Sequence, residues 1–300
     1  MAEAIRTTAQ NPSGRRPAFA FNWAWLGVLP FFLFIFAFLL WPTLAIVGRS
    51  FLDQQGRFSV NNVLELGSPF IRASYLYTIQ LSAAAAIIGG LIGFLLAYAV
   101  TVGGLPRWLR SSLLTFSGVA SNFAGIPLAF AFIATLGQLG LVTQLLKGLG
   151  IGLYPSFSLY SFWGLVIVYV YFQIPLMVLV IAPALDGLRR EWREAAESLG
   201  ASGWQYWRYV ALPILMPAIL GATVLLFGNA FGAHATAFAL TGGGSQTSVV
   251  TILIAAQISS DALSNPGLGN ALALGMIVIM AITIALYSWL QRRAERWIRS

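Results

Sequence analysis

The side chains best suited to chemistry lie in one short stretch of this sequence, residues 186–197. Seven of its twelve residues are charged, whereas charged residues make up 9% of the whole chain. Arginines and carboxylates of this kind form ion pairs and charged hydrogen bonds with another polar surface. The stretch contains no histidine or cysteine, which nucleophilic or metal-assisted reactions commonly use. It therefore predicts a contact surface rather than a catalytic centre.

The rest of the composition also argues against an enzyme. The chain has no cysteine, so it has no disulfide framework, thiolate metal site or cysteine nucleophile. Its single histidine, His234, excludes a site made of several histidines. We expect no catalytic residues, no metal and no cofactor in this chain.

Hydrophobic residues dominate the sequence and predict an all-α integral membrane protein. They make up 58% of the chain, and the mean hydropathy is +0.80. A helix needs about 20 mostly apolar residues to cross a bilayer. Six stretches meet that requirement and form a transmembrane domain over 24–290: 24–47, 75–102, 113–136, 161–185, 211–231 and 268–290. The stretch 248–258 is apolar but too short, and we expect a surface or re-entrant helix there.

The basic residues predict the orientation of these spans. With both termini inside, thirteen Lys and Arg residues lie on the inner side and four on the outer side. Such an excess marks the cytoplasmic side of a membrane protein. It also explains the net charge of +8 without nucleic acid. We therefore expect cytoplasmic tails at 1–23, which we expect to be disordered, and at 291–300.

The stretch 186–210 lies between the fourth and fifth spans, on the inner side. Its apolar residues recur every three or four positions from Leu185 to Leu199, which predicts a helix with one apolar face. Gly200 follows at the position where a helix cap favours a left-handed residue. A second short helix over 204–210 then leads to Pro213, which the first turn of the next helix tolerates. The pattern alone fits either a helix resting on lipid or a docking surface for a soluble partner.

This segment resembles the loop that marks permease subunits of binding-protein-dependent type I ABC importers. The matching residues are Glu194-Ala195-Ala196, Gly200, Val210 and Leu212-Pro213, where the family usually has Ile in place of Val210. The resemblance covers about 24–297. It implies the type I permease fold, with a cytoplasmic coupling helix in a multi-pass protein of the bacterial inner membrane.

The resemblance also implies the function and the partners. The chain is expected to form half of a translocation path and to couple ATP hydrolysis by a separate subunit to uptake of a small solute. The partners are an ABC ATPase dimer that binds ATP and Mg, a second permease of the same or another sequence, and an extracytoplasmic substrate-binding protein. The ATPase is expected to dock on these residues: Arg190, Glu191, Glu194, Ala195, Ala196, Leu199, Gly200, Ala201 and Pro213.

Several polar or helix-breaking residues lie within the predicted spans or just beyond the outer end of the fifth. They are Asn122, Pro127, Gln173, Pro175, Asn229 and His234. Polar and small residues commonly hold transmembrane helices together, and Gly89 and Gly93 have a spacing typical of close helix packing. Alternatively, these six residues line the translocation path, with the prolines as kinks near a gate.

The sequence leaves more than one possibility for the transported solute and for the class of transporter. The family resemblance is greatest to the polyamine (spermidine and putrescine) permeases, with ferric iron, thiamine, phosphonate and sulfate permeases as competitors. None of the nine acidic residues lies inside a predicted span, so a polyamine cation has no ionic partner there. The same absence argues against a proton-coupled carrier, whereas a sodium-coupled secondary transporter remains as an alternative.

Overall fold

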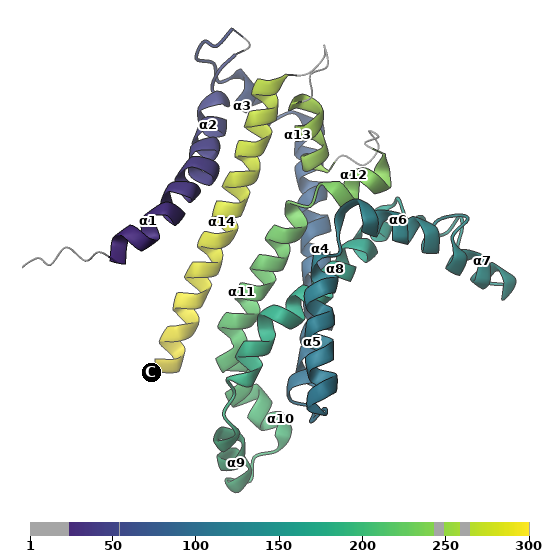
Figure 1. The fold of residues 1–300 in the computed structure, drawn as a ribbon, viewed down its shortest axis with the longest axis vertical. Helices are drawn as coiled ribbons and strands as arrows, with labels where there is room; N and C mark the ends of the chain where they lie inside the picture. Colours follow the sequence, from purple (N-terminus) through teal and green to yellow (C-terminus); the bar gives the residue numbers. More distant parts are fainter. Residues whose placement is uncertain (1–23, 54, 243–248, 259–264, 300) are drawn as a thin grey trace, which may run out of the picture. The chain divides into compact units, whose positions relative to one another are not determined.

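The computed structural model describes residues 24–53, 55–242, 249–258 and 265–299, and these are almost entirely helical (Figure 1). The predicted tail at 1–23 lies outside the described residues. Six helical stretches are long and apolar enough to cross a membrane: Gly27–Arg49, Pro69–Thr101, Gly125–Gly148, Phe162–Asp186, Gly203–Phe231 and Pro266–Arg292. The expected all-α architecture with six spans is confirmed.

The described residues up to Ala45 belong to a separate unit of the chain. This first span comprises α1 (Ala24–Ile35), the π turn η1 (Phe36–Leu40) and α2 (Trp41–Arg49), which continues beyond the unit. In η1 the amide of Trp41 donates to the carbonyl of Phe36, five residues back. Pro42 follows, and a proline ring crowds the carbonyl four residues before it. A widened turn relieves that crowding.

Three helices form the centre of the second unit and lie side by side in Figure 1: α4 (Pro69–Thr101), α8 (Phe162–Asp186) and α11 (Leu212–Phe231). The most apolar window of α8 is 61% buried, against 11% for the last span, so α8 is the central helix. Ser161 caps α8 by accepting a hydrogen bond from the amide of Gly164 at 3.3 Å.

Two glycines allow α4 and α8 to approach closely. A methyl group on Gly89 would lie 2.5 Å from Cβ of Gln173, and one on Gly93 would lie 2.6 Å from the carbonyl oxygen of Ile174. The close packing that the Gly89–Gly93 spacing predicts is therefore present. Buried apolar side chains such as Leu81, Met177 and Leu226 fill the remaining space between the three central helices.

The predicted third span, 113–136, is not one helix. It is divided between α5 (Arg107–Asn122), which packs on α8, and α6 (Gly125–Leu136), which packs on α12 (Ala235–Thr241). The break lies at Phe123 and Ala124, and Gly125 has a left-handed φ of +73°. The long apolar stretch after the break comprises α6 and α7 (Leu141–Gly148). The sequence-based interpretation overlooked the break because hydropathy stays high across it.

The short helix α13 (Val250–Ile258) packs on α4 at the end opposite the charged loop, while the long helix α14 (Pro266–Arg299) packs on α13, α11 and α3 (Asn61–Glu65). Thr78 of α4 accepts a hydrogen bond at 3.0 Å from the amide of Val250, the first residue of α13. Tyr75 of α4 donates to the carbonyl of Leu272 in α14 at 2.5 Å. Helix α14 includes 291–299, so the expected C-terminal tail continues the last span as a helix.

Candidate functional site

The charged stretch 186–197 lies at one end of the bundle, where it includes the last residue of α8 and most of a separate short helix (Figure 1). Central helix α8 ends at Asp186, and a new helix, α9 (Arg190–Ser198), begins after Arg189 in an extended conformation. This break divides the apolar face that the sequence predicts from Leu185 to Leu199 between two helices, α8 and α9. Leu185 is buried and Leu188 packs against the core, whereas Leu199 is 89% exposed. The apolar residues at the start of the predicted face therefore pack against the bundle, whereas Leu199 at its end is exposed to solvent.

A tight turn closes α9. Gly200 has φ of +79°, the left-handed conformation that the sequence predicts. The amide of Gly200 donates to the carbonyl of Glu197 at 2.9 Å, and the amide of Ala201 donates to the carbonyl of Ala196 at 3.0 Å. These two bonds form a Schellman motif, which satisfies carbonyls that a helix end would otherwise leave free. The turn exposes Leu199 at its apex.

Ion pairs fix the charged face of α9. Arg190 pairs with Glu194 at 3.0 Å, and Arg193 pairs with Glu197 at 2.9 Å, each four residues apart. The hydrogen bond to Glu197 raises the pKa of the Arg193 guanidinium above its ordinary value. No residue of α9 is buried in the single chain. Its carboxylates, guanidinium groups and small alanine surface are therefore accessible to solvent.

The segment after the turn does not begin a separate helix at Pro213. Instead α10 (Gly203–Tyr206), the π turn η2 (Trp207–Ala211) and α11 form one continuous helical stretch. Ser202 and Gln205 make a reciprocal capping box at its start. In η2 the amide of Leu212 donates to the carbonyl of Trp207, five residues back. As at Pro42, the widened turn immediately precedes the residue before a proline, here Pro213, and accommodates its ring.

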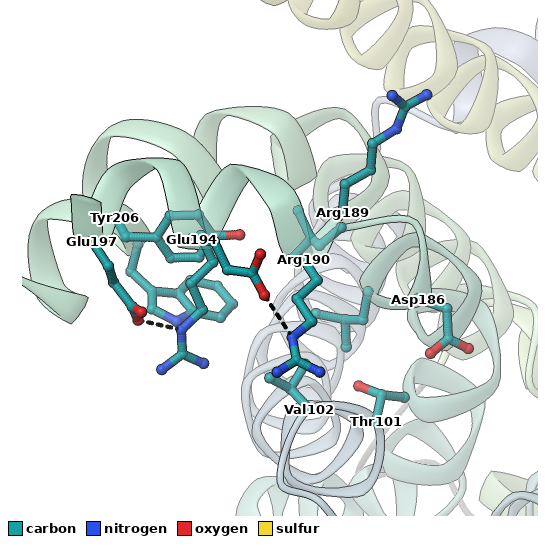
Figure 2. A pocket seen from close by; sticks show the side chains of 12 residues that line it. Thr101, Val102, Asp186, Arg189, Arg190, Glu194, Glu197 and Tyr206 are labelled. Carbon is teal, nitrogen blue, oxygen red and sulfur yellow. Dashed lines mark hydrogen bonds and ion pairs between the residues drawn. The ribbon is translucent and has the colours of Figure 1, made fainter. Parts of the chain in front are cut away.

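A polar pocket of about 760 Å³ lies between α9 and the ends of α4 and α8 (Figure 2). Thr101 and Val102 border it on one side, and Glu194, Glu197 and Tyr206 on the other. Figure 2 shows the Arg190–Glu194 ion pair beside this space, while the side chain of Arg189 points away. The pocket leaves α9 attached to the bundle chiefly through its two ends.

Two connections to the core hold the ends of the loop. Arg110 at the start of α5 pairs with Asp186 at the end of α8, at 2.5 Å. At the other end of the loop, the Trp207 ring packs edge-on against Tyr98 of α4, with centroids 4.9 Å apart. The sequence-based interpretation did not identify Arg110, Tyr98 or Trp207. The sequence offered one indication of these contacts: Arg110 and Asp186 have opposite charges and are both predicted on the inner side.

Two of the predicted path residues, Gln173 and Pro175, are buried within the three-helix centre. Gln173 is fully buried, and its Nε2 donates to the carbonyl of Leu226 in α11 at 2.8 Å. Its Oε1 is buried and has no hydrogen-bond partner among the described residues. Pro175 is also buried, within α8. Gln173 therefore connects α8 to α11 within the chain.

The other predicted path residues lie near the break between α5 and α6 or near α12. Asn122 is exposed at the end of α5, and Asn229 is exposed on α11. Pro127 lies in the first turn of α6, so it follows the break and does not kink a continuous helix. His234 precedes α12 and stacks on Phe238, with ring centroids 5.5 Å apart. The six residues therefore do not form one cluster.

Thr236 stabilises the break between α5 and α6 through a hydrogen bond. The sequence-based interpretation did not identify this residue. Its hydroxyl is buried and accepts a hydrogen bond from the amide of Gly125 at 2.8 Å.

Among the described residues, no group of three or more His, Asp or Glu side chains could hold a metal ion. The site offers an exposed surface that suits binding of a partner.

Comparison with known proteins gives a consistent result. The family model of the binding-protein-dependent transport system inner membrane component matches residues 89–300. The spermidine/putrescine transport system permease protein PotB of Haemophilus influenzae is 27% identical over 85% of this chain and 90% of its own length. The sulfate transport system permease protein CysT of Salmonella typhimurium is 29% identical over 74% of this chain and 76% of its own length.

Solved structures share the fold. A bacterial ABC transporter involved in the import of the acidic polysaccharide alginate aligns with a TM-score of 0.70 at 17% identity, over 90% of this chain and 95% of the other. A second structure of the alginate transporter, in complex with a pentasaccharide-bound periplasmic protein, aligns with a TM-score of 0.67 at 17% identity, over 90% and 94%.

Proposed function

Because the chain belongs to the family of binding-protein-dependent transport system inner membrane components, we propose that 186–213 couples its movements to a separate ATPase. The chain is a permease subunit of an ABC importer and a multi-pass protein of the bacterial inner membrane. Its role is to form part of the membrane passage, while ATP hydrolysis takes place on another chain. This membership replaces the sodium-coupled alternative.

One observation carries the coupling role. The α9 helix, its ion pairs and the turn at Gly200 are exposed, yet the loop is held at both ends by the Arg110–Asp186 pair and by Trp207 on Tyr98. A partner that moves α9 therefore pulls on α4, α8 and α11 together. Ala195 and Ala196 permit a close backbone approach, and the exposed Leu199 offers an apolar contact.

The partner set follows from the same proposal. An ABC ATPase dimer binds ATP and Mg²⁺ and docks on the loop, a second permease completes the passage, and a substrate-binding protein delivers the solute. The excess of basic residues on one side supports cytoplasmic N- and C-termini. Four path residues are not buried in the single chain and are available to face a second permease: Asn122, Pro127, Asn229 and His234.

A single exposed residue tests the coupling role. Replacing Leu199 by Arg should leave the chain inserted but reduce ATP hydrolysis by the reconstituted complex about tenfold, because a charge replaces the apolar contact. The matched control is Leu64→Arg in α3, another exposed leucine, 69% exposed, at the opposite end of α4. Equal hydrolysis with both variants would contradict the proposal.

For the solute, a polyamine is the first candidate and sulfate the second. The long alignment with PotB supports the polyamine, and the similar identity to CysT supports sulfate. Cells that produce the complete transporter should take up labelled spermidine, and excess unlabelled sulfate should not compete. Uptake of labelled sulfate without spermidine uptake would replace the first candidate by the second.

A further inference from the structure

An apolar groove runs beside the coupling segment, on the outer surface of α4 and α10–α11. Its volume is about 610 Å³. The residues that line it are Phe94, Leu95, Tyr98, Trp204, Trp207, Arg208 and Leu212. Six of these seven side chains are apolar or aromatic, and the seventh is a single arginine. The groove therefore suits a ligand with a long apolar part and one anionic group.

The order of these residues along the helices gives the groove a direction. Phe94 and Leu95 lie about two turns before the end of α4, which is Thr101. Trp204 and Arg208 lie near the start of the stretch that leads into α11, and Leu212 lies farther along it. Trp and Tyr side chains concentrate where a membrane meets water, and arginine reaches toward the headgroups. The apolar end of the groove thus lies toward the bilayer interior and the arginine toward the surface.

Arg208 is free to receive an anion. Among the described residues, Arg110, Arg190 and Arg193 each pair with a carboxylate, whereas Arg208 has no acidic partner. Its guanidinium carbon instead lies 5.8 Å from the centre of the Tyr209 ring. A guanidinium group binds phosphate oxygens through paired hydrogen bonds, and basic pockets between transmembrane helices hold anionic lipid headgroups.

We propose that this groove binds one anionic glycerophospholipid, with an acyl chain along Phe94, Leu95 and Leu212 and the phosphate at Arg208. Charge complementarity and the apolar lining both select this occupant. Trp207 lines the groove and also borders the polar pocket under α9. The bound lipid therefore supports the Trp207–Tyr98 contact from the membrane side and stiffens the base of the coupling segment.

Native mass spectrometry of the full chain in mild detergent tests this proposal. Phosphatidylglycerol and phosphatidylcholine are added in equal amounts, and the lipid retained by the protein is counted. The native chain should retain phosphatidylglycerol preferentially. Arg208→Gln should lower its retention about fivefold, the effect of one basic residue near an anionic headgroup. Arg107→Gln is the control, because Arg107 is also exposed and adjoins an exposed tryptophan but does not line the groove.

A second pair of variants tests the acyl chain. Leu95→Trp should fill the groove and lower phosphatidylglycerol retention, whereas Leu91→Trp, one turn away on the same exposed face of α4, should not. Excess inorganic phosphate should not displace the lipid. The proposal is overturned if Arg208→Gln and Arg107→Gln behave alike, if phosphatidylcholine is retained equally, if both tryptophan variants bind normally, or if phosphate alone displaces the lipid.

Discussion

The amide of Ala201 donates to the carbonyl of Ala196 at 3.0 Å, and this bond folds the chain back over Gly200 at the end of α9. The relationship fixes where Leu199 projects and where α10 begins. It depends on a backbone conformation that only glycine adopts without strain. The shape of the proposed docking surface therefore depends on one glycine.

Replacing Gly200 by Ala should open this turn. The position has φ of +79°, and a methyl group added there would meet no atom within 4 Å, so the cost of about 1–2 kcal/mol comes from the backbone alone. Hydrogen exchange at the Ala201 amide should become roughly tenfold faster, and uptake by the reconstituted transporter should fall. Gly203→Ala is the control, because Gly203 is equally unobstructed and lies outside the left-handed region. Equal exchange and uptake in both variants would show that the turn is unimportant.

A methyl group at Gly89 should separate α4 from α8. It would lie 2.5 Å from Cβ of Gln173, and the resulting overpacking should lower the free energy of unfolding in detergent by about 1–3 kcal/mol. Gly90→Ala provides the comparison, since its methyl would meet Leu226 at an ordinary 3.6 Å. That variant should be neutral or stabilising, because alanine favours a helix over glycine. Unchanged stability of Gly89→Ala would indicate that the helices are not as close as described.

Gln173 should behave as a packing residue. Replacing it by Met removes the hydrogen bond to Leu226 and also the buried Oε1 that lacks a described partner. The free energy of unfolding should change by less than about 1 kcal/mol, since such bonds between membrane helices contribute modestly. Uptake should be retained. Gln173→Glu should lower the amount of folded protein, because a carboxylate is costly inside the membrane. Loss of uptake by a stable Gln173→Met protein would instead place Gln173 on the path.

The Arg110–Asp186 pair should contribute little to stability but matter for coupling. Both side chains are partly exposed, at 35% and 45%, so a double-mutant cycle with alanine should give an interaction of about 0.2–1 kcal/mol. High salt should reduce that value. Uptake per ATP hydrolysed should fall in either single variant, because α5 and α8 are no longer held together beside the loop. An interaction of several kcal/mol would contradict the exposed geometry.

The number of spans and the turn at Gly200 could be predicted because both depend on local sequence. Apolar length alone identifies a span, and the glycine after Leu199 identifies the helix end. The break at Phe123 could not be predicted, because the hydrogen bond between Gly125 and Thr236 that supports it joins residues more than a hundred positions apart. Gln173 was ambiguous for the same reason: its partner, Leu226, is known only from the packing of α8 on α11.

Co-purification of the ATPase with this chain tests the coupling role most directly. The native chain and a Glu194→Arg, Gly200→Val double variant are produced with the partner subunits and isolated in mild detergent. An ATPase that accompanies the native chain and is lost from the inserted double variant is the result predicted here. Equal recovery of the ATPase with both proteins would contradict the assignment of 186–213 as the docking segment.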